Sequence, residues 1–374
     1  MNKPILAAAT ALATLPFSVS ADINFSGFAT IAGGMATDSD VVIRNYEDNF
    51  DFKEGSFFAL QAYSDLTEGL SATVQIRARG RDDWEPEFTW AYLAYEVKPG
   101  WRVQMGRQRI PMYLYSDYLD VSYAYHWIAP PTEVYRAPFD SIDGISTIHD
   151  FSLGNADVNL RLYYGKEDFE SGGFAFELDD IVSAVASVNY GWWTFRTSYL
   201  YFNFSGTLGL EPLVEAWYQT PFPFVGDDLN IEDDAHHGFE VGIRYDDQDW
   251  LFIAEYIPSK IDHTIIGDYG SWMVSAGKRF ADGKYMVHAT VGEETNQPYS
   301  SLDQVPYGLD PGLDALIDAT QGALDGRDYD IPFYSVGLRY DFHPSAAFKA
   351  EYTHSEDPSG QKGGVFQLAV VTVF

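Results

Sequence analysis

The sequence predicts an all-β fold, a transmembrane antiparallel β-barrel of about sixteen strands. Apolar and polar residues alternate along many short segments, which places neighbouring side chains on opposite faces of a sheet. Tight turns alternate with long polar loops along the chain. Aromatic residues make up 16% of the 374 residues and hydrophobic residues 46%, yet the mean hydropathy is slightly negative. This combination is typical of a sheet with one apolar face and one wet face.

The N-terminal residues match an export signal. Lys3 supplies a positive charge, residues 5–15 form an apolar core, and small residues precede Asp22. This order predicts a signal peptide at residues 1–21 and a barrel domain at residues 22–374; a short buried helix is the alternative. No later stretch reaches the ~18 consecutive apolar residues of a membrane helix. The chain has no Cys, so an exported fold of this size does not depend on disulfides for stability.

The strands follow from alternation with a period of two. Between residues 70 and 79 every even position is apolar, whereas the odd positions are Ser, Thr, Gln, Arg and Arg. The same alternation recurs at residues 158–164, 239–245, 334–340 and 348–352. The predicted strands are residues 22–36, 55–65, 69–80, 87–97, 101–109, 142–152, 155–166, 179–190, 191–203, 236–247, 249–258, 270–281, 284–294, 332–343, 346–356 and 363–374.

The connections between these strands alternate in length. Tight turns are predicted at residues 66–69, 98–100, 154–155, 190–191, 246–249, 282–283 and 344–345. Long polar loops are predicted at residues 37–54, 81–86, 110–141, 167–178, 204–235, 259–269, 295–331 and 357–362. Both ends of the barrel domain lie on the side of the tight turns. Outer-membrane barrels have this layout, with short periplasmic turns and long extracellular loops.

One loop contains a predicted helix, and the ends of several strands carry aromatic residues. Apolar residues recur at helical spacing between Asp310 and Asp325, after Pro311. This helix is expected to pack on a loop or on the barrel rim; a plug in the channel is the alternative. Aromatic rings favour the level of the lipid headgroups, although ordinary strand propensity is the alternative explanation. The aromatic residues next to the tight turns are Trp101, Trp192, Trp193, Trp250, Phe280, Phe342 and Phe374.

The last predicted strand ends in Phe374, preceded by Thr372, Val370, Leu368 and Phe366 at alternate positions. This pattern resembles the assembly signal of Gram-negative outer-membrane proteins. Together with the signal peptide and the opening strand DINFSGF, the chain resembles the general bacterial porins. The resemblance implies a bacterial outer-membrane location, a sixteen-stranded barrel, a homotrimer, and contact with outer-membrane lipid and lipopolysaccharide.

The most specific local resemblance is the segment VQMGRQRIP at residues 103–111. It resembles the strand that leads into the third loop of such porins. In that family the third loop folds inward and narrows the pore. The resemblance therefore implies that the long segment after Arg109 forms the constriction of a channel.

Several charged residues are expected to point into the lumen. If the apolar positions face lipid, their charged neighbours must face inward, since a charge facing lipid at the midplane would cost roughly 2–4 kcal/mol. The residues concerned are Arg77, Arg79, Arg102, Arg161, Arg196, Arg244, Arg339, Lys349, Glu240, Glu351 and Glu255. A polar inner wall lets ions keep their hydration, and charge at the narrow point selects among solutes.

A more specific hypothesis concerns the constriction. Arg77, Arg79 and Arg102 lie on the strands nearest the third loop and are predicted to form a basic wall. The acids predicted to oppose it are Asp117, Asp120, Glu133, Asp140 and Asp143. Opposed charges would create a transverse field that disfavours bulky apolar solutes. The alternative is scattered charges that only keep the wall wet.

The net charge of −32 excludes a nucleic-acid partner, because phosphate binding needs a basic face. Much of the acid lies in residues 204–235 and 295–331. No cofactor is predicted; loosely bound Ca²⁺ or Mg²⁺ at these loops is the alternative, since both ions prefer carboxylate oxygens. The neighbouring His236 and His237 are not expected to bind a metal, because neighbours on a strand point to opposite faces.

The function expected from these features is a porin for passive diffusion of small hydrophilic solutes and ions. A porin selective for a sugar or for an anion such as phosphate is the first alternative. An outer-membrane barrel enzyme and a soluble secreted β protein are more distant alternatives. No nucleophile elbow, P-loop, HExxH or dinucleotide-binding unit is present in the sequence, so an enzyme is not expected. The solute, the ion preference and the pore radius stay open at this point.

Overall fold

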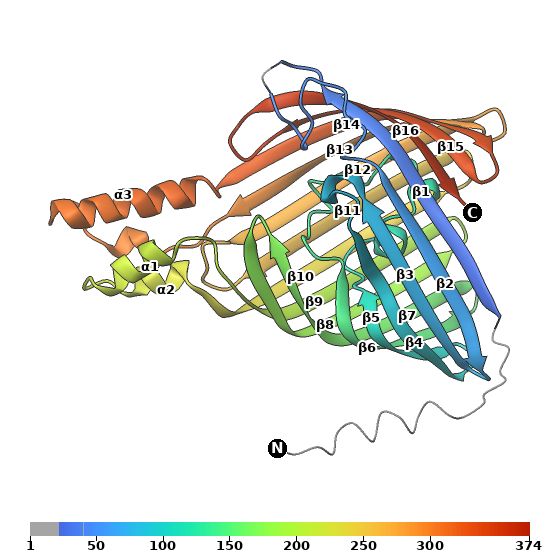
Figure 1. The fold of residues 1–374 in the computed structure, drawn as a ribbon, viewed down its shortest axis with the longest axis horizontal. Helices are drawn as coiled ribbons and strands as arrows, with labels where there is room; N and C mark the ends of the chain where they lie inside the picture. Colours follow the sequence, from blue (N-terminus) through green and yellow to red (C-terminus); the bar gives the residue numbers. More distant parts are fainter. Residues whose placement is uncertain (1–21, 40) are drawn as a thin grey trace, which may run out of the picture.

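The computed structural model describes residues 22–39 and 41–374, so the predicted signal peptide at residues 1–21 lies outside the described residues. Sixteen strands form a closed antiparallel barrel in which each strand pairs with its neighbours in the chain (Figure 1). The barrel closes where β1 (Ile23–Ala36) pairs with β16 (Lys362–Val373). The predicted fold class is therefore confirmed, because the ring of paired strands leaves no free sheet edge.

The remaining strands occupy the predicted segments, with most boundaries shifted by a few residues. They are β2 (Phe57–Thr67), β3 (Leu70–Arg79), β4 (Pro86–Lys98), β5 (Trp101–Arg109), β6 (Ser141–Leu153), β7 (Ala156–Ser171), β8 (Phe174–Tyr190), β9 (Trp193–Gly206), β10 (Ile231–Asp246), β11 (Trp250–Ile261), β12 (Asp268–Phe280), β13 (Tyr285–Gln297), β14 (Tyr329–His343) and β15 (Ala346–Glu356). We call the end with the tight turns the short-turn end and the opposite end the long-loop end.

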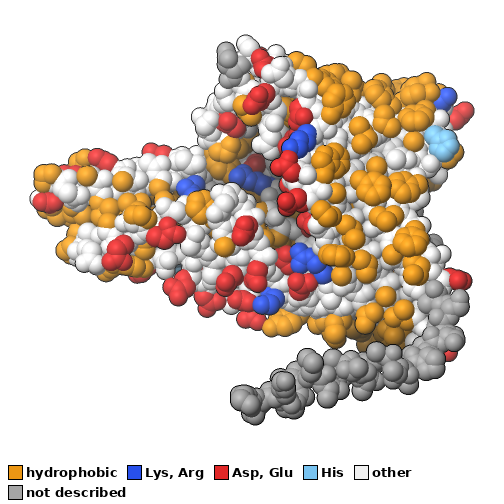
Figure 2. Space-filling view, in the orientation of Figure 1, with side chains coloured by type: hydrophobic (Ala, Val, Ile, Leu, Met, Phe, Trp, Pro, Cys, Tyr) orange, Lys and Arg blue, Asp and Glu red, His pale blue; other side chains and the backbone are white. Residues whose placement is uncertain are grey.

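The alternation predicted from the sequence sets which side chains face outward. On β3, Val74 and Ile76 are exposed on the outer surface, whereas Gln75 and Arg77 are buried inside the barrel. Figure 2 shows hydrophobic side chains covering the barrel wall, while acidic side chains gather along the rim and on the projecting loops. The outer face of the wall is thus apolar, as a membrane-spanning barrel requires.

One predicted loop is wrong. Residues 167–178 were expected to form a long polar loop, but β7 and β8 continue through this segment and meet in a two-residue turn at Gly172 and Gly173. Both glycines have positive φ angles, 60° and 83°, which a tight turn of this kind requires. Asp168, Glu170 and Glu177 are exposed beyond the apolar belt, and Glu167 is buried in an ion pair with Arg107, so all four acids are compatible with strand structure.

Two of the long loops fold into a lobe that projects beyond the barrel rim (Figure 1). It contains α1 (Glu211–Tyr218), α2 (Phe224–Leu229) and α3 (Pro311–Asp325). The predicted helix is therefore confirmed, and Asp310 caps it by accepting hydrogen bonds from the backbone N–H groups of Gly312 and Leu313. Because α3 packs in the lobe, it does not plug the barrel. Within the described ranges, no helix has both the length and the apolar character needed to cross a bilayer.

Most of the aromatic residues predicted near the tight turns are exposed at the short-turn end. They are Trp192, Trp193, Trp250, Phe280, Phe342 and Phe374. Trp101 differs, because its ring stacks on His149 at 5.3 Å and its indole N–H donates to Thr147. The six exposed rings form a band at one edge of the apolar belt, where an aromatic ring can face both lipid and water.

Candidate pore constriction

The third loop, residues 110–140, connects β5 to β6 and folds into the barrel lumen. Its apolar residues, including Tyr115 and Trp127, pack against the inner wall. On the wall, Leu251 and Ile253 point inward, and so does Phe333. The expected polar inner wall is therefore absent from this part of the barrel. The inward apolar residues are covered by the third loop and removed from water, which stabilises its inward position.

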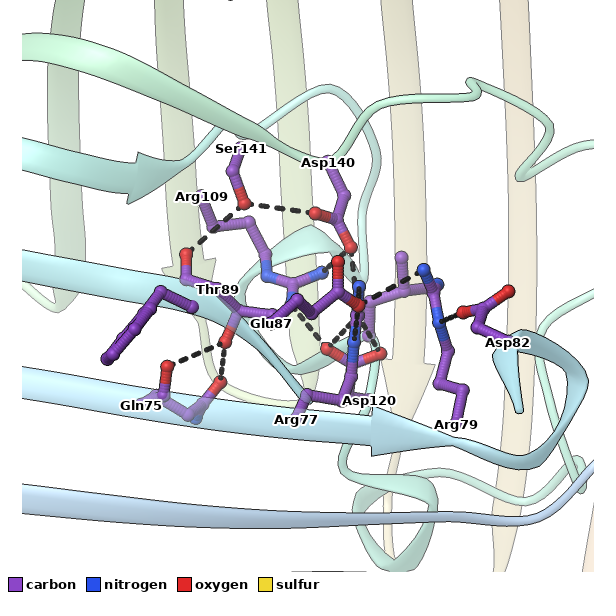
Figure 3. Close-up of polar contacts among 12 residues, drawn as sticks. Gln75, Arg77, Arg79, Asp82, Glu87, Thr89, Arg109, Asp120, Asp140 and Ser141 are labelled. Atoms are coloured by element: carbon purple, nitrogen blue, oxygen red, sulfur yellow. Dashed lines mark hydrogen bonds and ion pairs between the residues drawn. The ribbon is translucent and has the colours of Figure 1, made fainter. Parts of the chain in front are cut away.

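A cluster of four charged residues ties the third loop to the wall near β3 and β5 (Figure 3). The guanidinium group of Arg77 lies 2.6 Å from the carboxylate of Asp120 and 2.9 Å from that of Asp140. Arg109 pairs with the same two carboxylates. Glu87 of β4 adds a third acid at 2.8 Å from Arg77. The Arg77 side chain is only 2% exposed, so its pair with Asp120, which is 13% exposed, is largely shielded from water.

The two arginines favour the ionised form of Asp120 and Asp140. Burial works against ionisation of Asp120 and Asp140, but the charges of Arg109 and Arg77 outweigh it and hold both pKa values below the usual range. The two arginines and the two aspartates therefore neutralise one another. The predicted juxtaposition of Arg77 with Asp120 and Asp140 is present, but as direct ion pairs and not as opposed charges across an open gap.

The other two arginines of the predicted basic wall lie elsewhere. Arg79 is half-buried and pairs with Asp82 at 2.6 Å and with Glu87 at 3.1 Å. Arg102 is exposed near the start of β5, at the short-turn end. Within the described residues Arg102 forms no ion pair with an acid of the third loop, so the structure does not include it in the basic side of the cluster. Arg109, at the end of the same strand, takes part instead.

The remaining predicted acids are spread along the loop. Asp117 pairs with Arg161 of β7 at 2.6 Å. Glu133 pairs with Arg44 and accepts a hydrogen bond from Ser355 at 2.7 Å. Burial alone would raise the pKa of Glu133. Arg44 and Ser355 lower it by more than burial raises it, so the net shift is downward.

Asp143 lies on β6 and pairs with Arg107 at 3.1 Å, outside the cluster. Arg44, Arg107 and Arg109 were not predicted as site residues. Only the position of Arg109, directly before the third loop, could have indicated its role.

Lys349 of β15 holds the backbone of the third loop. Its Nζ donates to the carbonyl groups of Ser122 at 2.5 Å, Tyr125 at 2.8 Å and Trp127. Three carbonyl acceptors match the three N–H donors of an ammonium group. Arg339 of β14 adds hydrogen bonds to the carbonyl groups of Tyr123 at 2.8 Å and Tyr125 at 2.7 Å.

Other predicted lumen charges hold the beginning of the loop. Arg196 donates to the carbonyl of Pro111 at 2.7 Å and lies 3.3 Å from Glu240. Glu255 accepts from the backbone N–H of Leu114 at 2.9 Å. These side chains face inward as predicted, but they fasten the third loop and are not part of a wet wall.

The remaining predicted lumen charges are Glu351 and Arg244. Glu351 is buried 4.0 Å from His288. Arg244 pairs with Asp246, which Arg279 also contacts at 2.6 Å. Arg279 was not predicted as a site residue.

Open space lies on both sides of the third loop. On the long-loop side a cavity of about 670 Å³ lies between the loop and the wall of β7 to β11. On the short-turn side a cavity of about 320 Å³ is lined by Arg244, Arg279 and Arg339, with Asp341 beside them. In the described part of the chain, no group of three or more His, Asp or Glu side chains is arranged to hold a metal ion.

Comparison with known proteins places the fold. No family model and no curated sequence matches the chain. Among solved structures, OmpF of Salmonella typhi in complex with daunomycin has a TM-score of 0.60 and 11% identity, over 94% of this chain and 97% of that chain. OmpT, an outer membrane protein of Vibrio cholerae, has a TM-score of 0.58 and 14% identity over 96% and 99%. An anion-selective porin from Comamonas acidovorans has a TM-score of 0.58 and 12% identity over 95% and 100%. The chain therefore has the fold of outer-membrane porins.

Proposed function

We propose that this chain forms a water-filled channel in the outer membrane of a Gram-negative bacterium, through which small hydrophilic solutes and ions diffuse. The observation that carries this proposal is a closed sixteen-stranded barrel, apolar outside, with its third loop fixed across the lumen. A barrel that spans a membrane while a loop narrows its interior can restrict solutes by size and by charge. The long loops would face the outside of the cell and the short turns the periplasm.

Charge would act at two levels of such a channel. The long loops carry much of the acid of the chain, which favours cations at the entrance. Below the third loop, Arg244, Arg279 and Arg339 outnumber the acids Asp246 and Asp341 that contact them. A solute would therefore meet an acidic rim first and a basic region near the periplasmic exit.

A homotrimer is part of the proposal. The Vibrio cholerae OmpT structure is described in a trimer form, with 14% identity and a TM-score of 0.57 to this chain. An exposed apolar wall would be covered partly by lipid and partly by neighbouring copies. Lipopolysaccharide would surround the trimer on its outer side.

The alternative of a barrel enzyme gains no specific support. Two Ser–His pairs lie inside the barrel: Ser275 with His126 at 2.9 Å, and Ser259 with His236 at 2.5 Å. A serine nucleophile needs an acid that orients the other ring nitrogen of its histidine. Among residues 22–39 and 41–374, the Nδ1 atoms of both His126 and His236 have no hydrogen-bond partner. The proposed function is therefore passive transport, with no catalysed reaction.

Reconstitution in planar lipid bilayers tests the proposal. The folded barrel should produce stepwise increases in conductance, and steps in multiples of three would support the trimer. The same protein, unfolded by heat in detergent before addition, is the control for leakage that detergent causes. Folded barrels that insert into the bilayer without any conductance would overturn the channel.

A further inference from the structure

The cavity on the long-loop side of the third loop has the size of a ligand site. Its volume is about 670 Å³, within the roughly 300–1,000 Å³ that is typical of small-molecule sites. The third loop forms its floor with residues such as Met112 and Phe139, and strands β7 to β11 form one wall. Arg327, just before β14, and Tyr329, the first residue of that strand, lie on the opposite side.

The wall of this cavity is aromatic. The ring of Phe139 lies 5.5 Å from that of Phe169, which stacks on Phe176 at 5.2 Å. Phe176 in turn stacks on Phe204 at 5.4 Å. Phe202 lies 5.8 Å from Phe139. Rings from the third loop and from three strands therefore form one continuous apolar surface inside the barrel.

This surface is not what diffusion of hydrated solutes requires. On β9 the inward side chains change from Arg196 and Ser198, beside the third loop, to Leu200, Phe202 and Phe204 towards the long-loop end. A polar wall would keep a passing ion hydrated. An apolar patch that borders open space in a channel instead favours solutes with apolar surface. Aromatic side chains also accept a further ring in stacked or edge-on contact.

A cation borders the same cavity. Arg327 lines it and donates a hydrogen bond to the carbonyl of Ala323 at 3.3 Å. Within the described ranges it has no ion pair, whereas Arg136, the other arginine at the cavity, pairs with Glu294. Burial lowers the pKa of Arg327, since no acid compensates its charge. The planar guanidinium group matches the two oxygens of a carboxylate.

We infer that this cavity binds small aromatic carboxylates, with the ring against the phenylalanine wall and the carboxylate near Arg327. The inference rests on the proposed channel function and specifies the class of solute that the channel favours. The site lies directly above the constriction, so a solute held there is concentrated at the narrowest part of the path. A solute with only an aromatic ring would contact only the phenylalanine wall, and a solute with only a carboxylate would contact only Arg327.

The test is equilibrium binding of phenylacetate to the barrel in lipid nanodiscs, measured by calorimetry with empty nanodiscs as the blank. Benzyl alcohol, which lacks the charge, and acetate, which lacks the ring, are the comparison ligands. The Kd of phenylacetate should be at least ~10-fold lower than that of either comparison ligand. Equal binding of acetate or of benzyl alcohol would overturn the inference.

Amino-acid substitutions test whether Phe202 and Arg327 contact the bound phenylacetate. Phe202→Ala and Arg327→Gln should each weaken phenylacetate binding ~10-fold, as for residues at the centre of a site. Phe195→Ala, on the outer face of the same strand, and Arg102→Gln, at the other end of the barrel, are matched controls that should bind like the wild type. Phe202→Leu removes the ring but keeps an apolar side chain if the alanine variant does not fold. Unchanged affinity in either folded Phe202 variant or in Arg327→Gln would contradict the assignment.

Conductance separates this inference from the channel proposal. A barrel that conducts but does not bind phenylacetate overturns the inference and leaves the channel intact. A barrel that binds phenylacetate but never conducts supports the site and overturns the channel.

Discussion

Arginine has different roles at different heights in this barrel. Arg77 is buried among three acids, whereas Arg102 is exposed on β5 near the short-turn end. Both were predicted to face the lumen, since both occupy polar positions of an alternating strand. Alternation identifies the face of the sheet, but the height of a residue along the strand decides which residues of the third loop it can contact.

Replacing Arg77 with Gln should make the channel more selective for cations. Asp120 and Asp140 would then share only Arg109, which leaves an uncompensated negative charge at the constriction. Loss of one partner from a buried ion pair typically costs about 3–5 kcal/mol, so the free energy of unfolding should also decrease. The reversal potential in a KCl gradient measures the selectivity.

Arg102→Gln is the matched control for this experiment. It removes the same charge from a position that is exposed and lies outside the four-residue cluster, so the reversal potential should stay close to that of the wild type. If the two variants shifted the reversal potential equally, the four-residue cluster would not be the selective point.

At the scale of the element, the third loop is held mainly through its backbone. Residues 110–140 contain only two short 3₁₀ turns, η4 (Ser116–Tyr118) and η5 (Ser122–Ala124). Many carbonyl groups of such a loop lack partners within the loop itself, and buried carbonyls need partners. Lys349 and Arg339 supply them from β14 and β15.

Replacing Lys349 with Met should release the middle of the third loop. The carbonyl groups of Ser122 and Trp127 would lose the Lys349 donor, and that of Tyr125 would keep only Arg339. Each hydrogen bond to a charged group contributes about 1.5–3 kcal/mol. We expect a noisier open-channel current and a changed mean conductance, measured in single-channel recordings.

The control for Lys349→Met is Lys260→Met. The Lys260 side chain is 61% exposed, and in the described part of the chain its one ion pair is with Asp262, at 3.9 Å. The current should therefore resemble that of the wild type. Identical current noise in Lys349→Met and the wild type would indicate that the aromatic packing alone fixes the loop.

The ends of β7 and β8 illustrate how the polarity of a strand depends on its surroundings. Beyond the apolar belt the outside of the barrel is wet, so Asp168, Glu170 and Glu177 face outward while Phe176 and Leu178 face inward. Within the membrane the opposite arrangement is expected, with apolar side chains facing outward and polar side chains facing inward. The sequence-based prediction of a loop at residues 167–178 failed because it treated acids as evidence against a strand.

At the scale of the whole molecule, the barrel is closed by the seam between β1 and β16. The backbone N–H of Phe374 donates to the carbonyl of Gly27 at 2.9 Å, and its carbonyl accepts from the N–H of Gly27 at 2.8 Å. The Phe374 ring stacks on Phe58 at 6.0 Å. A Cβ atom at position 27 would lie 2.5 Å from this ring, so glycine leaves the space that the ring fills.

Phe374→Ala should reduce the fraction of chains that assemble into folded barrels. The variant keeps the backbone hydrogen bonds of the seam but loses the ring contact with Phe58 and the space filled beside Gly27. Folded and unfolded barrels differ in electrophoretic mobility when samples are left unheated, which gives the assembled fraction after refolding into detergent.

Phe342→Ala is the matched control, since Phe342 is similarly exposed at the short-turn end but lies away from the seam. It should assemble like the wild type. Equal losses in the two variants would mean that Phe374 acts only as one member of the aromatic band.

The sequence by itself determined the sixteen strands, the short and long connections except the one between β7 and β8, the outward face of the strands within the membrane, and the helix at residues 311–325. These features depend on local periodicity and on turn residues, which neighbouring positions reveal. It also identified Arg77, Asp120 and Asp140 as members of one site. Only the tertiary structure decided that they pair directly, that Arg109 replaces Arg102, and that Lys349 binds loop carbonyls. These contacts join residues up to 227 positions apart, and no local pattern encodes which distant groups meet once the barrel closes.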